Sequence, residues 1–338
     1  MLLLNLGGPD SLRAVKPFLF NLFSDREIIR LGPSFLQKPI AWLISSLRSS
    51  KTEGFYGLIG GKSPICDITF AQAKALDEAL NRSQLRETPP LAPPCQGGDG
   101  GVKVYVAMRY WHPLIEDVIP EIYKDGVRRL VVLSLYPQYS VATTGSTLRK
   151  LDEVVSKYPI EIFSIKSWYD NQLYIDALVD EIKKGMDAFR NGQGDPAPTS
   201  EVHVLFSAHS LPVKFIEEGD PYADQTQATI KEIVSKIDVQ WSLSYQSKSG
   251  PVQWLGPSTD EMIEKLAEKG TRNLLVVPIS FVSDHIETLY EIDILYKGMA
   301  EKLGMRLERV RSLNTSPLFI SALQQLVVQG MEEAGWLE

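Results

Sequence analysis

The sequence predicts an α/β fold made of two similar halves, each a doubly wound, mostly parallel sheet covered by helices. Short apolar runs alternate along the chain with segments of helical periodicity, which is typical of parallel sheets. Residues 112–139 also align without gaps on residues 256–283, and each block reads as helix, glycine turn, buried strand and polar loop. The alternative is that two unrelated βα units share this pattern, because α/β chains repeat it often.

Short aliphatic and β-branched runs predict the strands, and apolar residues three and four positions apart predict the helices. The first half covers residues 1–165, with an inserted segment at 25–65, and the second half covers residues 166–338. Ligands of such sheets bind beyond the carboxyl ends of the strands, so the loops there are the informative places. We expect strands at residues 2–6, 102–108, 130–135, 161–165, 202–207, 239–244 and 273–278, and helices at 65–80, 114–124, 173–189, 225–237, 259–268, 286–303 and 317–331.

Composition and short motifs exclude several classes of protein. A net charge of −7 without a basic stripe argues against a nucleic-acid partner. Two cysteines exclude a disulfide framework and favour a reduced, cytoplasmic setting. Gly7-Gly8-Pro9 is not the Gly-x-Gly-x-x-Gly pattern of dinucleotide folds, and Gly61-Lys62-Ser63 lacks the first glycine of a P-loop. We therefore expect no bound nucleotide.

One segment bears on membranes. We expect no secretory leader, because residues 1–8 lack its basic and long apolar parts, and no run of about 20 apolar residues could span a bilayer. Residues 35–48 are rich in large apolar side chains and carry basic residues near their ends, so they could lie in a membrane interface. The alternative is a core helix with basic ends. The hypothesis is a cytoplasmic protein that associates peripherally with a membrane surface through this segment.

Side chains that could act in catalysis or bind a metal lie at or after the ends of two predicted strands. His209 ends a buried strand, where a lone histidine is more often structural than catalytic. After the strand at 273–278, Glu287 and Glu291 are four residues apart and share one face of the helix that begins there. The alternative is a capping box with Asp284 as N-cap, which accounts for Glu287 but not for Glu291. Imidazole and carboxylates together suit Fe(II), Zn(II) or Co(II).

These stretches resemble the signature motifs of the ferrochelatase family, and further matches follow in family order over nearly the whole chain. The two strongest are Leu205-Phe206-Ser207-Ala208-His209-Ser210-Leu211-Pro212 and Ser283-Asp284-His285-Ile286-Glu287-Thr288-Leu289-Tyr290-Glu291. The others are Asn5-Leu6-Gly7-Gly8-Pro9, Gly60-Gly61-Lys62-Ser63-Pro64-Ile65, Tyr136-Pro137-Gln138-Tyr139-Ser140, and Gln246-Ser247-Lys248 with Trp254-Leu255-Gly256-Pro257.

The resemblance implies two Rossmann-like, chelatase-like halves with a porphyrin cleft between them, residues 25–65 forming its lip. It implies that His209 accepts the pyrrole protons, that Glu287 is its carboxylate partner, and that His209, Glu287 and Glu291 face the metal. Leu295 would interrupt the acidic row of the family. The porphyrin would contact Leu6, Arg48, Ser63, Arg109, Tyr110, Tyr136 and Trp254, with Arg48 and Ser63 at its propionates.

The resemblance also implies the substrates, Fe(II) and protoporphyrin IX, and no permanently bound cofactor. Animal-type members carry an iron–sulfur cluster; here Val141 stands at the first ligand position and the chain ends at Glu338, so we expect no cluster. The alternatives are a chelatase for coproporphyrin III or for Co(II) or Ni(II) in another tetrapyrrole, and, from a different class, a porphyrin or haem carrier. A carrier needs no base, so the pairing of His209 with Glu287 argues against it.

Overall fold

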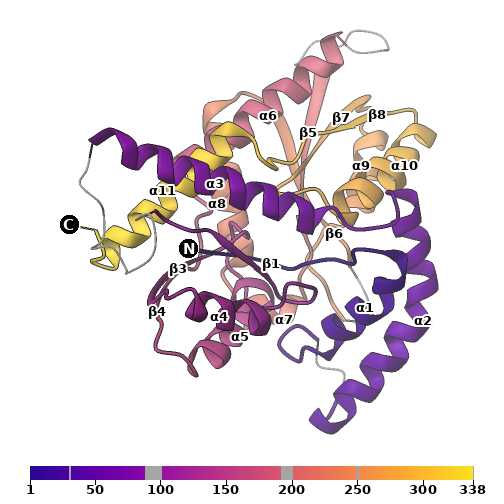
Figure 1. Cartoon of the computed structure of the whole chain (residues 1–338). Helices are drawn as coiled ribbons and strands as arrows, with labels where there is room; N and C mark the ends of the chain where they lie inside the picture. The colour runs from indigo at the N-terminus through magenta and orange to yellow at the C-terminus, as the bar shows by residue number, and fades with distance from the viewer. Residues whose placement is uncertain (30–31, 88–100, 192–200, 249, 251, 338) are drawn as a thin grey trace. The chain divides into compact units, whose positions relative to one another are not determined.

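The computed structural model describes residues 1–29, 32–87, 101–191, 201–248, 250 and 252–337, and the chain divides into two compact units (Figure 1). Unit 1 comprises Met1–Trp168 and Asn314–Glu338, and unit 2 comprises Tyr169–Leu313. Each unit contains a four-stranded parallel sheet. The predicted α/β fold with two doubly wound halves is therefore confirmed.

The sheet of unit 1 has the strand order β2-β1-β3-β4. All four side chains of β1 are buried, as an apolar strand covered on both faces requires. On one face Leu4 and Val132 join a core with Ile119 and Leu151 from two helices. The elements in chain order are β1 (Leu2–Asn5), α1 (Val15–Ser24), α2 (Gln37–Leu58), α3 (Ile65–Glu87), β2 (Tyr105–Met108), α4 (Ile115–Lys124), β3 (Arg129–Ser134), α5 (Ser146–Val155), β4 (Glu161–Ile165) and α11 (Pro317–Glu333).

The last helix belongs to unit 1, although the sequence analysis assigned residues 166–338 to the second half. Helix α11 packs beside α3 and against β4 (Figure 1). Gly330 allows this approach, because a Cβ there would lie 3.2 Å from atoms of both Phe163 and Ile165. Phe319 adds a ring contact with Trp168, with ring centroids 6.0 Å apart.

Unit 2 repeats the arrangement with the strand order β6-β5-β7-β8. Its core joins Leu205 and Val276 of the sheet to Ile263, Ile292 and Tyr296 of the covering helices. The elements in chain order are α6 (Gln172–Asn191), β5 (Val202–His209), α7 (Val213–Glu217), α8 (Tyr222–Lys236), β6 (Gln240–Gln246), α9 (Thr259–Glu268), β7 (Asn273–Pro278), the π-helix η5 (Glu287–Tyr296), α10 (Lys297–Lys302) and β8 (Arg306–Arg309).

The internal repeat of the sequence corresponds to repeated structure. Pro113 and Pro257 occupy aligned positions, and both follow cis peptide bonds. The carbonyl of Pro113 accepts a hydrogen bond from the amide of Met108 (2.7 Å), and the carbonyl of Pro257 accepts one from Tyr245 (2.9 Å). In both blocks a helix and then an inner strand follow, α4 and β3 in one and α9 and β7 in the other. The repeat therefore reflects equivalent parts of the two sheets.

Strand β8 and helices α1, α5 and α7 were not among the predicted elements, and residues 35–48, most of which lie in α2, were given as a core helix only as an alternative. A single α-helix was predicted over residues 286–303. The structure has instead a wider π-helix over Glu287–Tyr296, followed by the short α10. An apolar pattern of this length does not distinguish the two helix types, because both bury residues four apart, here Ile292 and Tyr296. Among the described residues, no helix combines the length and apolar character that crossing a bilayer requires.

Candidate active site

A histidine–carboxylate pair lies at the carboxyl end of the central strand β5. The Nδ1 atom of His209 is 2.8 Å from Oε2 of Glu287, the first residue of η5. Two side chains fix the backbone of His209. The His209 amide donates to Ser280 Oγ (2.8 Å), and the His209 carbonyl accepts from the Tyr222 hydroxyl (2.8 Å). The side chains of His209 and Glu287 are 32% and 18% exposed, so substrate can reach them although most of their surface is covered.

The pair sets the protonation of both partners. Burial favours the neutral form of Glu287, but the charge and hydrogen bond of His209 outweigh burial and lower the pKa of Glu287 to about 2. Burial also disfavours the imidazolium, but Glu287 outweighs it and raises the pKa of His209 above 6.5. An ionised Glu287 can only accept, so neutral His209 carries its proton on Nδ1. Nε2 is then the atom that can accept a proton.

Glu291 lies beside the pair and is linked to it through one hydroxyl. Oγ of Ser247 is 2.8 Å from Oε2 of Glu287 and 2.6 Å from Oε2 of Glu291. Ser247 has a φ of 66°, in the left-handed region that non-glycine residues seldom adopt, and such conformations cluster at functional sites. The hydroxyl therefore brings together the two carboxylates that the sequence placed on one helix face.

These distances favour a protonated Glu291. The Ser247 hydroxyl has one proton, which it can share between the two carboxylates or donate to Glu287 alone. A proton on Glu291 would satisfy both contacts at once and would separate the two carboxylate charges. In agreement, burial and the charge of Glu287 raise the pKa of Glu291 to about 7. Near neutral pH Glu291 can thus hold or release a proton.

Gln246 fixes Glu291 from the end of β6. Its Nε2 donates to Glu291 Oε2 (3.2 Å) and to the backbone carbonyl of Glu287 (3.1 Å), while its Oε1 accepts from Ser207 Oγ (2.7 Å). The Ser207 contact orients the amide, because it holds the carbonyl end away from the carboxylates. In the sequence, Gln246 and Ser247 were named only as part of a motif. Their position at the end of a strand could have identified them as site residues.

His285 is a second histidine at this site. It is 5% exposed, Nδ1 lies 3.0 Å from the Ser283 carbonyl, and Nε2 is buried without a hydrogen-bond partner in the structure. The ring packs on Phe281, with ring centroids 4.1 Å apart. Burial lowers the pKa of His285, so the ring is neutral at pH 7. In the sequence, His285 is part of a signature motif but has no predicted role.

The capping-box alternative for Glu287 does not describe its contacts. The carboxylate of Glu287 binds His209 and Ser247. Asp284 accepts hydrogen bonds from Thr288 (3.2 Å) and Arg309 (2.9 Å). Glu287 therefore belongs to the site and does not cap the helix. The capping box of unit 2 lies elsewhere, between Ser258 and Glu261 at the start of α9.

The predicted porphyrin contacts divide between the units. Trp254 is in unit 2, where it bridges to Pro212 just after His209; its Nε1 is buried without a partner. In unit 1, Leu6 directly follows β1, and its carbonyl accepts a hydrogen bond from the Tyr110 amide (3.0 Å). Five further residues of unit 1 belong to this set: Ser63 and Tyr136, which are buried, and Arg109, Tyr110 and Arg48, which are treated below.

A buried carboxylate organises Arg109 and Tyr110. Asp25 accepts hydrogen bonds from Arg109 Nη2 (2.7 Å), the Tyr110 hydroxyl (2.6 Å) and Ser146 Oγ (2.7 Å). Burial opposes the charge of Asp25, but these donors outweigh it and lower its pKa below 3.8. Tyr110 is only 2% exposed, because its hydroxyl points into this network. The sequence carried no motif that would have revealed Asp25.

Arg48 lies on α2. It is exposed, and its guanidinium is 5.5 Å from the centre of the Phe23 ring. The buried residues of this helix are Gln37, Ala41, Ser45 and Tyr56. Among the large apolar residues of the predicted membrane segment, Ile40 is partly buried, and the others are exposed: Phe35 and Leu36 just before the helix, and Trp42, Leu43 and Leu47 on it. The core-helix alternative therefore does not describe them.

Within the described residues, no three His, Cys, Asp or Glu side chains are grouped so that they could hold a metal ion. His209, Glu287 and Glu291 come together as a hydrogen-bonded chain that runs through Ser247. Cys66 is partly buried, and Cys95 lies outside the described residues.

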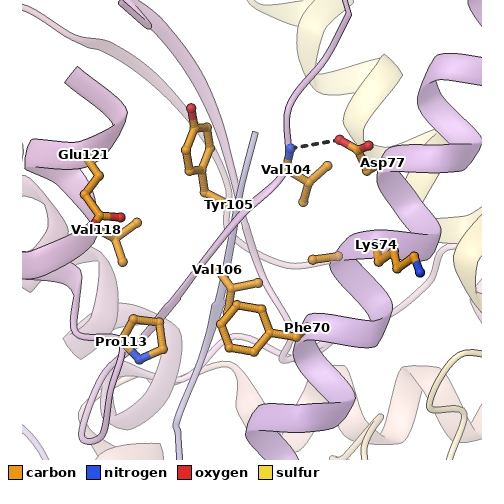
Figure 2. A pocket seen from close by; sticks show the side chains of 10 residues that line it. Phe70, Lys74, Asp77, Val104, Tyr105, Val106, Pro113, Val118 and Glu121 are labelled. Atoms are coloured by element: carbon orange, nitrogen blue, oxygen red, sulfur yellow. Dashed lines mark hydrogen bonds between the residues drawn. The ribbon is translucent and has the colours of Figure 1, made fainter. Parts of the chain in front are cut away.

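A groove of about 490 Å³ is lined by residues of unit 1 and shares none with the histidine–carboxylate site (Figure 2). It is lined by α3, α4 and the segment around β2, including Phe70, Tyr105 and Glu121. Asp77 in its wall accepts a hydrogen bond from the Val104 amide (3.2 Å). The lining contains no histidine or cysteine, so it offers neither a base that titrates near pH 7 nor a thiolate.

The fold and the site define a class of protein. Among solved structures, SirB from Bacillus subtilis with Fe3+ matches with a TM-score of 0.53 and 14% identity, over 79% of this chain and 92% of that chain, so the fold is chelatase-like. The Ferrochelatase family model matches residues 1–331. Curated ferrochelatases from Geotalea uraniireducens and Synechocystis sp. are 49% and 46% identical, over 97% and 98% of this chain and 96% and 82% of theirs. The chain belongs to the ferrochelatase family, enzymes that insert a metal ion into a porphyrin.

Proposed function

We propose that this enzyme inserts Fe(II) into protoporphyrin IX to form protohaem, the terminal step of haem synthesis, with release of two protons. The observation that carries the proposal is the hydrogen-bonded pair of His209 and Glu287 at the end of β5. A metal dication replaces two pyrrole N–H protons, so the reaction needs a positioned base. The paired imidazole meets that need near neutral pH.

The residues divide the proton transfers between them. Nε2 of His209 accepts a pyrrole proton, and the ionised Glu287 stabilises the imidazolium that results. Ser247 connects Glu287 to Glu291, which exchanges protons because its pKa is about 7. A pocket that binds a puckered porphyrin more tightly than a flat one favours the transition state, since puckering exposes the nitrogen lone pairs.

Iron is a substrate here, and the metal-facing residues are proposed as its transient contacts. Imidazole nitrogen and carboxylate oxygen suit Fe(II), which makes His209, Glu287 and Glu291 the candidates. Leu295, one turn further along, is 49% exposed and brings no ligand atom to this row. The porphyrin nitrogens supply the remaining ligands as the metal enters the ring.

The porphyrin contacts remain those of the sequence analysis. Leu6, Tyr136 and Trp254 offer apolar or aromatic surface to the macrocycle, and Arg109 and Tyr110 line the pocket from the network around Asp25. The basic Arg48 and the hydroxyl of Ser63 are the proposed partners of the propionates. The cleft between the halves is part of this proposal.

Two features concern the setting of the enzyme. The exposed apolar residues of 35–47 support peripheral association with a membrane surface, where a poorly soluble porphyrin would be delivered. We also propose that the enzyme works without an iron–sulfur cluster, because a cluster needs four thiolates and the chain has two cysteines. Acid-labile sulfide that disappears together with activity in Cys66→Ser would contradict this.

The test is an anaerobic metal-insertion assay on the wild type, His209→Ala and His203→Ala. His203 is a matched control, since it lies on the same strand β5 and pairs with Ser242 (3.0 Å) far along the strand from the site. We expect His209→Ala to bind porphyrin but lose turnover by roughly a hundredfold or more, and His203→Ala to stay near wild type.

The substrates of the assay separate the alternatives. Each metal, Fe(II), Co(II) or Ni(II), is offered with protoporphyrin IX, coproporphyrin III or sirohydrochlorin. Preference for Fe(II) and protoporphyrin IX is the expected result. Preference for coproporphyrin III or for Co(II) would assign the enzyme to another branch. Tight porphyrin binding without insertion of any metal would favour a carrier.

A further inference from the structure

Arg309 binds both ends of the segment that carries Glu287 and Glu291. It is the last residue of β8, and its side chain is only 10% exposed. Its Nη1 donates to Asp284 (2.9 Å), three residues before η5. Its Nε and Nη2 donate to the two oxygens of Asp293 (both 2.8 Å), within η5. One guanidinium therefore holds two carboxylates that are nine residues apart.

The position of Asp293 around the helix axis depends on the helix type. Asp284 precedes the helix, and Asp293 lies six residues after Glu287, the first residue of η5. Six residues turn by about 240° in an α-helix of 3.6 residues per turn. They turn by roughly 120° in the wider π-helix, which has i→i+5 hydrogen bonds and about 4.5 residues per turn. A change of helix type would therefore swing Asp293 around the axis and away from Arg309. The bidentate contact with Asp293 adds a fixed geometry that a single hydrogen bond would lack.

The helix type in turn sets the angle between the two glutamates. Residues four apart in an α-helix differ by about 40° around the axis. In the wider helix the difference is roughly 30° in the opposite sense, so a change of type would swing Glu291 by about 70° relative to Glu287. Ser247 could then no longer lie within hydrogen-bond distance of both carboxylates.

We propose that Arg309 is a positioning residue that holds the π-helical form of residues 287–296 by joining Asp284 to Asp293, and so keeps Glu287 and Glu291 on Ser247. The consequence for turnover rests on the proposed function; the consequence for the helix does not. Other neighbours support the same state: Ser312 Oγ donates to Asp284 (2.8 Å), and Val310 pairs with Val276 of β7. Because β8 pairs with β7, the sheet fixes the position of Arg309.

The test compares Arg309→Met, Arg309→Lys and Asp293→Asn with Lys297→Met. Lys297 is the matched control, because it joins the next helix to the same strand through Glu308 (3.2 Å) but contacts neither Asp284 nor Asp293. Amide hydrogen exchange over residues 284–296 is measured first, without substrate. We expect exchange to rise at least tenfold in both Arg309 variants and less in Asp293→Asn, with α8 and α9 unchanged. Lys297→Met should match wild type.

Metal insertion and porphyrin binding are measured on the same proteins. We expect kcat to fall at least tenfold in both Arg309 variants, while the Kd for porphyrin stays within threefold of the wild-type value. Lysine keeps the charge but cannot span two carboxylates, so wild-type exchange and kcat in Arg309→Lys would refute the proposed role of Arg309. Wild-type exchange and kcat in Arg309→Met would also overturn it. If Arg309→Met fails to fold, Asp293→Asn decides in the same way.

The exchange experiment separates the two proposals. A wild type without metal insertion would refute the proposed function, while the exchange data would still decide whether Arg309 holds the helix. A wild type that inserts metal, together with unchanged exchange in every variant, would refute the role of Arg309 alone.

Discussion

Oε2 of Glu287 lies 2.8 Å from Nδ1 of His209, and the two residues come from elements that are far apart in the chain, the end of β5 and the start of η5. The contact joins an ionised carboxylate to an imidazole, so each partner stabilises the charged form of the other. Glu291, one turn later, is held nearer to its protonated form. Two glutamates on one helix therefore have different electrostatic states and different expected roles.

Glu287→Gln is expected to lower kcat about a hundredfold, because glutamine cannot stabilise the imidazolium of His209. The pKa of His209 is raised by the charge of Glu287, so removing that charge lowers it. Since the base acts deprotonated, the acidic limb of the pH–rate profile should move to lower pH. The measurement is kcat against pH for metal insertion.

Glu291→Gln is expected to lower kcat less than tenfold and to act mainly on the KM for the metal. Glu264→Gln is the control, since Glu264 is exposed on α9. Equal and small losses of kcat in Glu287→Gln and Glu291→Gln would indicate that Glu287 has only a structural role.

Ser247→Ala and Ser247→Gly are expected to lose activity to the same extent, since both lack the hydroxyl that joins the two carboxylates. Their stabilities should differ. The φ of 66° at this position favours glycine, so Ser247→Gly should be about 1 kcal/mol more stable than Ser247→Ala. Urea unfolding gives the difference. Full activity in either variant would refute the bridging role of the hydroxyl.

Much of the fold follows from local sequence patterns. The run Leu2-Leu3-Leu4 predicts a buried parallel strand because aliphatic residues occupy consecutive positions. The repeat of residues 112–139 at 256–283 predicts two equivalent halves, and its aligned prolines share one backbone geometry. Strand β8 escaped prediction because Arg306-Leu307-Glu308-Arg309 has a single apolar residue; pairing with β7 makes it a strand.

The site was predictable where it depends on position after a strand and unpredictable where it depends on long-range contacts. His209 ends β5, Glu287 follows β7, and the carboxyl ends of parallel strands meet at one edge of the sheet. Asp25 and Arg309 lie outside any motif that names their partners, since their contacts join residues distant in the chain. The π-helix depends on such contacts too, which is why residues 286–303 looked like an ordinary α-helix.

A double variant, Leu36→Asp with Trp42→Ser, is expected to float with liposomes less than the wild type does. The two side chains are 38% and 57% exposed; Leu36 lies just before α2, and Trp42 lies on it. Removing them takes away area that would enter the headgroup region. Leu318→Ser is the control, because Leu318 is also exposed, at 39%, but lies on α11. Equal flotation of all three proteins would refute membrane association through this segment.

Asp25→Asn is expected to destabilise the protein by about 3 kcal/mol at pH 7, because Arg109 would be left with an uncompensated and mostly buried charge. The pKa of Asp25 is lowered in the folded state, so its contribution to stability is fully present above about pH 4, the unfolded value. The contribution is lost as pH falls through the folded pKa. The wild type should therefore lose more stability than Asp25→Asn as the pH falls below about 4.

The measurement is the free energy of unfolding in urea at a series of pH values, for the wild type, Asp25→Asn and Asp125→Asn. Asp125 also binds a cationic side chain and a tyrosine, Lys103 and Tyr105, and their hydrogen bonds lower its pKa. Unlike Asp25, it lies on the surface. Solvent screening weakens such a pair, so Asp125→Asn should follow the wild type closely. If Asp25→Asn kept the full acid dependence of the wild type, the network around Asp25 would not be the source of that dependence.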